Sequence, residues 1–261
     1  MIGRYNRHEL LKMIGPEGQT RIRKARVFVA GVGALGSLIS MLLARAGVGF
    51  LRIADLDTPE IHNLHRQLLY DEADVTGGAS KVVAARNHLL ASNSEIEIDA
   101  VAQAIGPDNI EALTDGVDLV VDALDNIRTR YHVNDAVIRR GVPYVFGGAV
   151  EAAGNVMTII PGRTPCLRCL WPDPDAVKNH PTAAQVGVLS SAASAVASFQ
   201  VTEALKVIVG REDEILEGLL VMDLWRGTFY NVPVARDPSC VCAACPTDPA
   251  DETERVAAAG R

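Results

Sequence analysis

The sequence predicts an α/β protein built on a doubly wound, mostly parallel sheet, with a zinc-stapled C-terminal part. A β-branched run at 26–30 leads directly into the glycine-rich turn Gly31-Val-Gly33-Ala-Leu-Gly36. Later apolar runs do not alternate with polar residues and are separated by helical patterns, which is typical of strands covered on both faces. From Cys166 onward the chain carries two Cys-x-x-Cys pairs. Together these features indicate a Rossmann-like fold with a metal-bound C-terminal part.

Each element is predicted from its own pattern of apolar residues and breakers. A mixed-charge helix is expected over 5–26 and a second helix over 37–46, which stops at Gly47. Further helices are expected over 81–90 and 190–209, where Ser190, Ser194 and Ser198 repeat at a spacing that fits core packing or, alternatively, a contact between subunits. The expected strands are 26–30, 50–57, 96–101, 117–123, 143–147 and 155–160, followed by a hairpin of 219–224 and 228–234.

Composition and charge narrow the class of protein. The 261 residues are 48% hydrophobic and carry a net charge of -7, so the chain is neither disordered nor a general binder of nucleic acid or anionic membranes. The uncharged run 181–202 contains several Ser and Gln residues, which favours a buried helix over a membrane span. The polar start of the chain resembles no signal peptide, and we expect a cytoplasmic protein. We expect one domain over 1–246 and a frayed tail over 247–261.

The cysteines predict a structural zinc site. Cys166 and Cys169 form one pair, Cys242 and Cys245 form the other, and 72 residues separate the pairs. Four thiolates close a tetrahedral zinc site, whereas redox pairs or disulfides are disfavoured in a cytosolic chain. We expect Cys166, Cys169, Cys242 and Cys245 as ligands; Cys240 is left over and either replaces Cys242 or remains a free thiol.

The glycine-rich turn predicts a nucleotide site. Gly31 permits the tight turn, Gly33 lets phosphate approach backbone N–H groups, and Gly36 allows helix and strand to pack closely. Asp55 lies 19 residues after Gly36, at the end of the next strand, where it can accept hydrogen bonds from ribose hydroxyls. These features alone fit NAD, FAD and ATP equally well.

Charged residues at later strand ends favour a triphosphate. Arg66 and Lys81 would neutralise phosphate oxygens, and Asp125 follows an apolar strand, where it is placed to hold Mg²⁺. Each of these residues alone would more often be an ordinary surface charge. Their joint occurrence beside the glycine turn reverses that judgement.

At this point the chain resembles the E1-like adenylating enzymes of the HesA/MoeB/ThiF type. The resemblance runs from Arg4 to Cys245 and includes both cysteine pairs and six separated motifs. These motifs are Arg4-Tyr5-Asn6-Arg7, Gly31-x-Gly33-x-x-Gly36, Asp55-x-Asp57, Asn63-x-x-Arg66-Gln67, Lys81 and Asp122-x-x-Asp125-Asn126. The resemblance implies an enzyme that uses Mg·ATP to adenylate the C-terminal glycine of a ubiquitin-like sulfur-carrier protein ending in Gly-Gly.

The resemblance also implies a set of site residues. The nucleotide-binding set is Gly31, Gly33, Ala34, Gly36, Asp55, Asp57, Asn63, Arg66, Gln67, Lys81, Asp125 and Asn126, and the catalytic set is Arg7, Arg66, Lys81 and Asp125. By the same resemblance the enzyme is a homodimer in which Arg7 reaches the γ-phosphate of ATP bound by the partner, and Asp125 binds Mg²⁺.

The predicted chemistry needs no general base, because a carboxylate is already ionised at neutral pH and only requires alignment and charge neutralisation. Many relatives carry a cysteine in the segment before the long helix, but here 181–187 contains none. We therefore expect the reaction to stop at the acyl-adenylate, with a separate sulfur-donor protein. Because the chain ends soon after Cys245, no appended sulfurtransferase domain is expected.

Other functions remain open from the sequence. A variant of the same class would adenylate a peptide or another protein C-terminus. An NAD-dependent oxidoreductase explains the glycine turn but leaves Arg66, Lys81 and the cysteines without a role. A non-catalytic E1-like partner subunit is disfavoured because the ATP motifs are intact.

Overall fold

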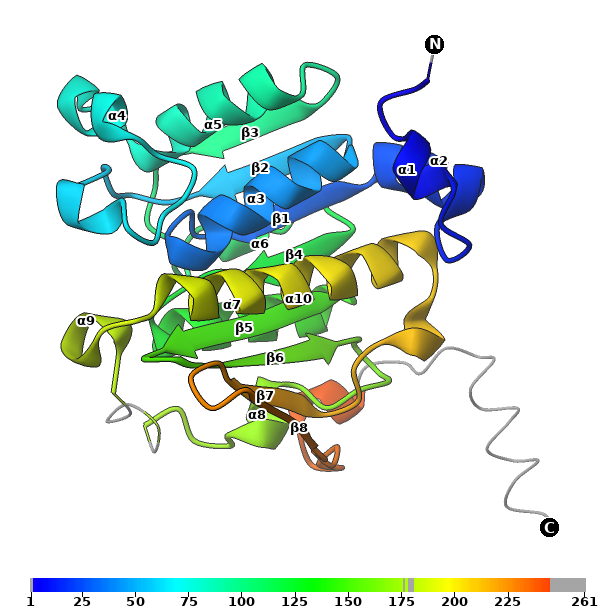
Figure 1. The fold of residues 1–261 in the computed structure, drawn as a ribbon. Coiled ribbons are helices and arrows are strands. Elements are labelled where there is room, and N and C mark those ends of the chain that lie inside the picture. Colours follow the sequence, from blue (N-terminus) through cyan, green and yellow to red (C-terminus); the bar gives the residue numbers. More distant parts are fainter. Residues whose placement is uncertain (1, 176, 178–180, 245–261) are drawn as a thin grey trace.

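An eight-stranded sheet forms the centre of the computed structural model, which describes residues 2–175, 177 and 181–244 (Figure 1). The spatial order is β3-β2-β1-β4-β5-β6-β7-β8; β1 to β5 pair in parallel and β6 to β8 join antiparallel. The strands are β1 (Arg26–Ala30), β2 (Phe50–Ala54), β3 (Glu97–Val101), β4 (Leu119–Asp122), β5 (Tyr144–Val150), β6 (Ala153–Ile159), β7 (Leu219–Asp223) and β8 (Thr228–Val232). The predicted α/β class with a mostly parallel sheet is therefore confirmed.

Helices cover both faces of this sheet (Figure 1). Helices α3 (Ala34–Ala46), α5 (Lys81–Ser92) and α10 (Ser190–Val209) lie on one face, and α6 (Ile110–Leu113) and α7 (Ile127–Arg140) lie on the other. The remaining helical segments are α1 (Asn6–Glu9), α2 (Gly15–Lys24), η1 (Ile61–Asn63), α4 (Glu72–Gly77), α8 (Leu167–Leu170), α9 (Ala183–Val186), η2 (Glu212–Glu214) and η3 (Val241–Ala244). Because both faces are covered, β4 is buried at every position, as its unbroken apolar pattern predicts.

The order of the parallel strands creates a switch point between β1 and β4. The chain leaves β1 toward β2 on one side of the sheet, whereas β4 continues to β5 on the other. Ala30, the last residue of β1, pairs with Asp122, the last residue of β4. Ligands of open α/β sheets bind in the crevice outside the carboxyl ends of the strands at such a point. A ligand site is therefore expected at the loops after β1 and β4.

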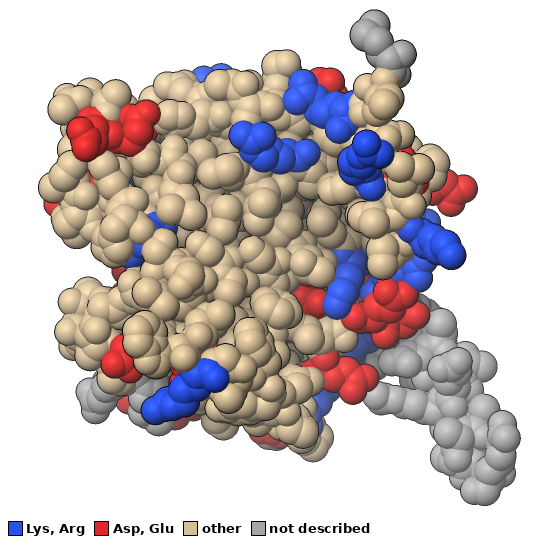
Figure 2. All heavy atoms as spheres, in the orientation of Figure 1, with Lys and Arg blue, Asp and Glu red and all other residues tan. Residues whose placement is uncertain are grey.

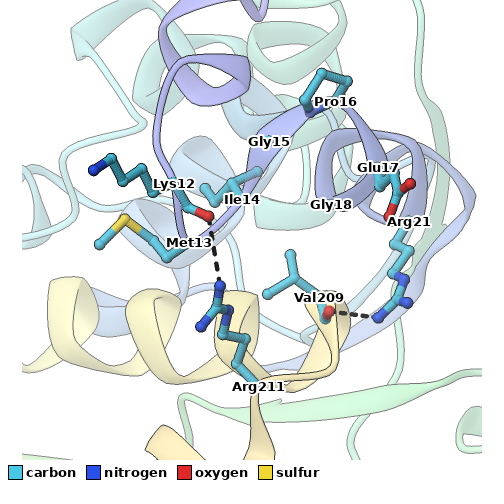
Figure 3. A pocket seen from close by; sticks show the side chains of 10 residues that line it. All are labelled: Lys12, Met13, Ile14, Gly15, Pro16, Glu17, Gly18, Arg21, Val209 and Arg211. Carbon is cyan, nitrogen blue, oxygen red and sulfur yellow. Dashed lines mark hydrogen bonds between the residues drawn. The ribbon is translucent and has the colours of Figure 1, made fainter.

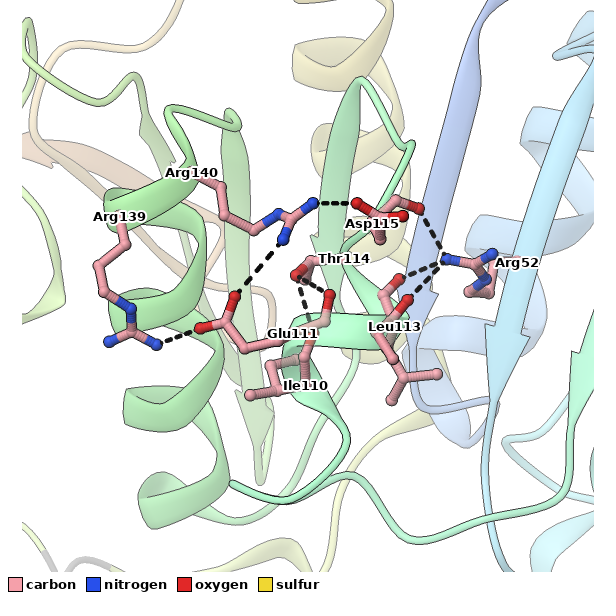
Figure 4. A network of polar contacts seen from close by, with 9 residues as sticks. Arg52, Ile110, Glu111, Leu113, Thr114, Asp115, Arg139 and Arg140 are labelled. Carbon is pink, nitrogen blue, oxygen red and sulfur yellow. Dashed lines mark hydrogen bonds and ion pairs between the residues drawn. The ribbon is translucent and has the colours of Figure 1, made fainter.

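A network of polar contacts fixes α6 against the sheet and against α7 (Figure 4). Arg52 of β2 donates to the carbonyl oxygens of Leu113 and Asp115 at the C-terminal end of α6. Glu111 of α6 forms ion pairs with Arg139 and Arg140 at the last turn of α7. The Arg52 contacts cap carbonyl groups at the end of α6 that would otherwise lack partners, and the ion pairs of Glu111 join α6 to α7.

Several expected boundaries were wrong, and two of them have a clear local cause. The single helix expected over 5–26 is divided into α1 and α2, because Gly15 has a φ of 63° and Pro16 stands in the first turn of a new helix, where its missing N–H costs no hydrogen bond. The strand expected over 50–57 ends at Ala54, since both carboxylate oxygens of Asp55 accept backbone hydrogen bonds, from Val32 and Asp57, instead. In both places a local contact overrides the apolar pattern.

The outer surface of α10 also differs from the expectation of core packing. Ser190 and Ser194 are half-buried and Ser198 is exposed. The hydroxyl groups of Ser194 and Ser198 donate to carbonyl oxygens one turn earlier in the same helix. By length and composition α10 is apolar enough to span a membrane, but its other side packs on the sheet, which identifies it as a core helix.

Candidate functional site: a nucleotide site at the switch point

The glycine-rich turn after β1 lies directly against the loop after β4. Gly31 has a φ of 95°, and a Cβ there would lie 2.8 Å from the Ala123 carbonyl oxygen. A Cβ on Gly36 would lie 2.0 Å from the Gly31 carbonyl oxygen. Neither position has room for a side chain, so backbone lines this part of the crevice. Because Gly33 and Ala34 begin α3, the first N–H groups of that helix are available to an anion.

Asp55 connects the loops after β1 and β2. One of its carboxylate oxygens accepts a hydrogen bond from the Val32 N–H at 2.9 Å, and the other accepts from the Asp57 N–H at 2.9 Å. This acid therefore fixes the glycine-rich turn in addition to the ribose contact that the sequence predicts. The sequence pattern places Asp55 correctly but does not reveal this second task.

Asn63, Arg66 and Gln67 lie together in the turn that follows β2. The Asn63 carbonyl accepts hydrogen bonds from the backbone N–H groups of Arg66 and Gln67, and Asn63 and Gln67 are buried. The Gln67 amide nitrogen lies 3.8 Å from the place where a Cβ on Gly33 would stand. Within the described residues the buried Gln67 Oε1 has no hydrogen-bond partner. The Gln67 amide nitrogen is the group that stands close enough to the glycine-rich turn to donate to a ligand bound beside Gly33.

Lys81 begins α5 beside the same loops. Its Nζ lies 2.8 Å from Asp57 Oδ2, and its backbone N–H donates to the Asp57 carbonyl. The Lys81 side chain is only 6% exposed, whereas that of Asp57 is 68% exposed. The ammonium group is thus held at the rim of the crevice by a single solvated carboxylate.

Tyr70 also belongs to the site, although no sequence pattern pointed to it. Its hydroxyl donates to the Val32 carbonyl at 2.9 Å and approaches the Lys81 carbonyl at 3.3 Å, so it joins the glycine-rich turn to α5. Burial, together with the carboxylate of Asp55, raises the pKa of Tyr70 far above its ordinary value, so the hydroxyl stays protonated as a donor. A lone tyrosine in a loop gives no sequence signal of such a role.

Asp125 and Asn126 occupy the loop after β4. Asp125 is exposed at the carboxyl edge of the sheet. The Asn126 side chain accepts hydrogen bonds from the N–H groups of Arg128 and Thr129 and so begins α7. Asn126 therefore acts in the fold as a helix cap, next to the acid predicted to bind Mg²⁺.

Arg7 is the one predicted catalytic residue that lies away from the carboxyl ends of the parallel strands, at the end of the sheet where these strands begin. Two residues earlier, the Tyr5 ring packs on Gly47, at the C-terminal end of α3. The glycine-rich turn is at the other end of that helix, roughly 20 Å away for a helix of this length. An arginine side chain does not span this distance, so Arg7 is separated from the nucleotide site of its own chain.

Four cysteines form a cluster beside α7, where α8 and η3 meet this helix. The sulfur atoms of Cys166, Cys169, Cys240 and Cys242 lie within 4.8 Å of one another. Cys166 Sγ is 3.5 Å from Cys240 Sγ, and Cys169 Sγ is 3.4 Å from Cys242 Sγ. Four thiolates around one zinc ion stand about 3.8 Å apart, so the spacing is compatible with zinc. Cys240 thus joins the cluster beside Cys242, while the predicted ligand Cys245 lies outside the described residues.

A separate hollow of about 500 Å³ lies between the α1–α2 connection and the end of α10 (Figure 3). Arg211 donates to the Lys12 carbonyl and Arg21 to the Val209 carbonyl across it. Each of the two arginines therefore already has a backbone carbonyl group as a hydrogen-bond partner. The hollow is on the side of the sheet away from the glycine-rich turn, and the predicted nucleotide residues do not line it.

The fold and these side chains define an E1-like adenylyltransferase: a Rossmann-like sheet with phosphate-binding groups at the switch point and a cysteine cluster compatible with zinc. The family model described as the ThiF family matches residues 5–243. The chain belongs to this family.

Individual relatives support the same assignment. The chain is 40% identical over 248 residues to the sulfur carrier protein ThiS adenylyltransferase of Bacillus subtilis, covering 95% of this chain and 72% of that protein. It is 38% identical to the sulfur carrier protein adenylyltransferase of Thermus thermophilus, covering 94% and 92%. A crystal structure of E. coli MccB with ATP has a TM-score of 0.81 at 24% identity, covering 93% of this chain and 74% of that chain, which shows the shared fold.

Proposed function

We propose that this enzyme transfers AMP from ATP to the C-terminal glycine carboxylate of a ubiquitin-like sulfur-carrier protein. The observation that carries the proposal is the convergence at one switch point of the glycine-rich turn, Lys81 and Asp125. Two relatives at 38–40% identity are named as adenylyltransferases for sulfur carriers, and they extend over nearly the whole chain. The dinucleotide oxidoreductase alternative accounts for neither the charged residues nor the family match.

The site fits ATP. Gly31 and Gly36 leave a backbone cradle that a Cβ would fill, and the amide nitrogen of Gln67 lies beside Gly33 in the same region. The N-terminal end of α3 favours the negative charge of the phosphates. Arg66 and Lys81 supply positive charge from the neighbouring loops. ATP would therefore lie across the carboxyl ends of β1, β2 and β4.

The reaction requires alignment more than proton transfer. An oxygen of the carrier's C-terminal carboxylate attacks the α-phosphorus, and the bond from that phosphorus to the bridging oxygen of pyrophosphate breaks. No proton is lost from the nucleophile, so no general base is needed. Lys81 and Arg66 stabilise the negative charge that develops on the phosphates. The fold holds both side chains in place before the reaction begins, so no reorganisation is needed.

Mg²⁺ is proposed at Asp125. An exposed carboxylate at the strand edge suits this cation, which is usually held by one or two carboxylates together with substrate phosphates. When bound, it would neutralise phosphate charge during displacement of pyrophosphate. Asn126 keeps Asp125 at the start of α7 through its capping hydrogen bonds.

We propose further that the enzyme is a homodimer in which Arg7 completes the site of the partner. Arg7 lies near the C-terminal end of α3, whereas the nucleotide site of the same chain lies at the N-terminal end of that helix. Leu10 and Met13, which follow it, are 65% and 54% exposed, and a second subunit would cover them. Over α3 and α10, Figure 2 shows a broad area with few charged side chains, which also suits contact between subunits.

Zinc is proposed as a structural ion. Burial raises the pKa of the Cys166 thiol to about 11, so binding of zinc would displace the proton of this thiol. Reduced thiols suit a cytoplasmic location.

Since the segment before α10 contains no cysteine, we propose that the acyl-adenylate is the product and that a separate protein donates sulfur.

Mg²⁺-dependent ATP–pyrophosphate exchange tests the proposed function. Carrier proteins that end in Gly-Gly are compared with versions that lack this tail. We expect exchange with at least one intact carrier and none with its truncated form. Exchange that persists without the tail, or its absence with every carrier despite confirmed ATP binding, would contradict the proposal and point to a peptide or another acceptor.

A further inference from the structure

A buried group of polar side chains lies directly beneath the loop that carries Asp125. Asp122, the last residue of β4, is fully buried, and its Oδ2 is 2.9 Å from Nε of Arg130. The Arg130 side chain is 13% exposed. Burial raises the pKa of Asp122, while the Arg130 guanidinium opposes this shift. The two residues therefore compensate each other's charge inside the protein.

The pair fixes the peptide groups just before Asp125. The N–H of Leu124 donates to Asp122 Oδ1 at 2.9 Å, and the carbonyl of Leu124 accepts a hydrogen bond from the Arg130 guanidinium. That carbonyl belongs to the same planar peptide unit as the Asp125 nitrogen. The backbone on the amino-terminal side of Asp125 is thus held at two consecutive peptide groups.

The same pair connects the loop to the elements around it. Arg130 belongs to α7 and also donates to the Gly147 carbonyl of β5 at 2.8 Å. Gln200 of α10 donates to the Asp122 carbonyl at 2.7 Å, and a Cβ on Gly147 would lie 2.3 Å from the Gln200 amide. No side chain other than hydrogen fits at Gly147 without moving this group. Elements from both faces of the sheet therefore hold one loop.

Stability alone does not account for the pair. Taking both charges out of water costs several kcal/mol per ion, and apolar residues of similar volume are often as stabilising as a buried ion pair. The contacts of Arg130 have a different consequence, because its planar guanidinium donates hydrogen bonds to the carbonyl oxygens of Leu124 and Gly147 while its Nε lies 2.9 Å from Asp122 Oδ2 as an ion pair. A lysine would keep the charge but could not reproduce this geometry.

We propose that Asp122 and Arg130 are positioning residues that fix the Asp125 carboxylate in the orientation required to bind the Mg²⁺ of Mg·ATP. This inference rests on the proposed function in one respect, since it takes Asp125 as the Mg²⁺ ligand. It assigns neither residue to direct contact with substrate. Residues that orient a metal ligand without touching the metal typically change metal affinity or activity by about 10- to 100-fold when they are altered.

The test measures ATP binding by titration calorimetry, without any carrier protein, as a function of Mg²⁺ concentration. The variants are Arg130→Lys and Asp122→Asn, with Arg139→Lys as a control at an exposed arginine of the same helix. We expect the Mg²⁺ concentration for half-maximal enhancement of ATP binding to rise about 10-fold or more in both variants. ATP affinity in the presence of a chelator should stay within about twofold of wild type, and the control should be unchanged.

Hydrogen exchange at Leu124 and Asp125 gives a second readout, which should be faster in both variants. Folded variants with Mg²⁺ dependence and loop exchange equal to wild type would overturn the proposal. If Arg130→Lys does not fold, Asp122→Asn decides, because it removes the charge that pairs with Arg130 and changes the volume of the side chain very little. Loss of folding in both variants would overturn the proposal and show that the pair serves stability. If no carrier is adenylated by the wild type, the proposed function fails, but this measurement still decides the role of the pair.

Discussion

Lys81 is a charged residue in a nearly buried position, and its single carboxylate partner explains how it is kept there. A buried ammonium group is costly unless it is paired. Asp57 provides that partner from a solvated position at 2.8 Å. Loss of Lys81 would therefore leave an exposed aspartate, not a buried unpaired charge. Removing the lysine should affect phosphate binding far more than folding.

Replacement of Lys81 by alanine should lower the rate of carrier-dependent ATP–pyrophosphate exchange by about 100-fold or more, as expected for loss of a preorganised charge at the phosphates. The melting temperature should change little. Lys24→Ala, at an exposed lysine of α2, serves as the control. Exchange by the Lys81 variant within tenfold of wild type would show that the lysine does not act on the phosphates.

At the residue scale, the sequence predicts well those positions whose role depends on local geometry. Gly31 and Gly36 are identified by spacing alone, and the structure shows why no side chain fits there. Tyr70 and Arg130 escape prediction because their partners are brought near by the fold: Val32 is 38 residues from Tyr70, and Gly147 is 17 from Arg130. The roles of the predicted catalytic and metal residues themselves stay predictions.

At the scale of elements, the short helix α8, which carries Cys169, is fixed to the helix that follows Asp125. The Leu167 N–H donates to the Asn134 side chain, and Arg168 forms two hydrogen bonds with Asp135, so α8 is fixed to α7 next to the cluster. Because α7 begins at Asn126, a bound zinc ion would hold the frame on which the nucleotide site is built. The apolar pattern of α7 gives no hint of this connection.

Purified enzyme should contain about one zinc ion per chain, measured by elemental analysis, as expected for a closed site of four thiolates. Removal with a strong chelator, or Cys166→Ser, should lower the melting temperature before it affects the chemistry of the site. Cys240→Ser and Cys245→Ser distinguish the fourth ligand by their zinc content. A metal-free protein of unchanged stability would contradict a structural zinc site.

Element boundaries were less predictable than the elements themselves. The periodic apolar residues of the N-terminal segment fit one helix, but Gly15 and Pro16 start a new one and leave Leu10 and Met13 exposed. An apolar residue at helical spacing can face a partner subunit as well as a core. A single sequence does not separate these two cases.

At the scale of the whole molecule, the position of Arg7 predicts sites shared between subunits. Arg7→Ala and Lys81→Ala should each be inactive alone, since each lacks one part of every site. Hybrid dimers would contain one site with both residues intact. Equal amounts of the two variants, after subunit exchange, should therefore recover about a quarter of wild-type activity. No recovery despite demonstrated exchange would place Arg7 outside the partner's site.

The architecture of the sheet was the most predictable feature of the molecule. Buried apolar strands separated by helices allow few arrangements, and the glycine-rich turn marks the strand beside the switch point. The pairing of Ala30 with Asp122, which brings the two loops together, follows from that topology. The arrangement of two subunits in a dimer depends on the side chains exposed on the protein surface. The periodicity of apolar residues carries little information about these surfaces.

The central claim is that the enzyme forms an acyl-adenylate on a carrier's C-terminal glycine, and trapping with hydroxylamine tests it most directly. Hydroxylamine attacks the activated carboxyl group, releases AMP and leaves a hydroxamate that mass spectrometry locates. We predict a hydroxamate on the last glycine that requires enzyme, Mg·ATP and the intact Gly-Gly tail. An unmodified carrier C-terminus under conditions in which the enzyme binds Mg·ATP and the carrier would contradict this claim.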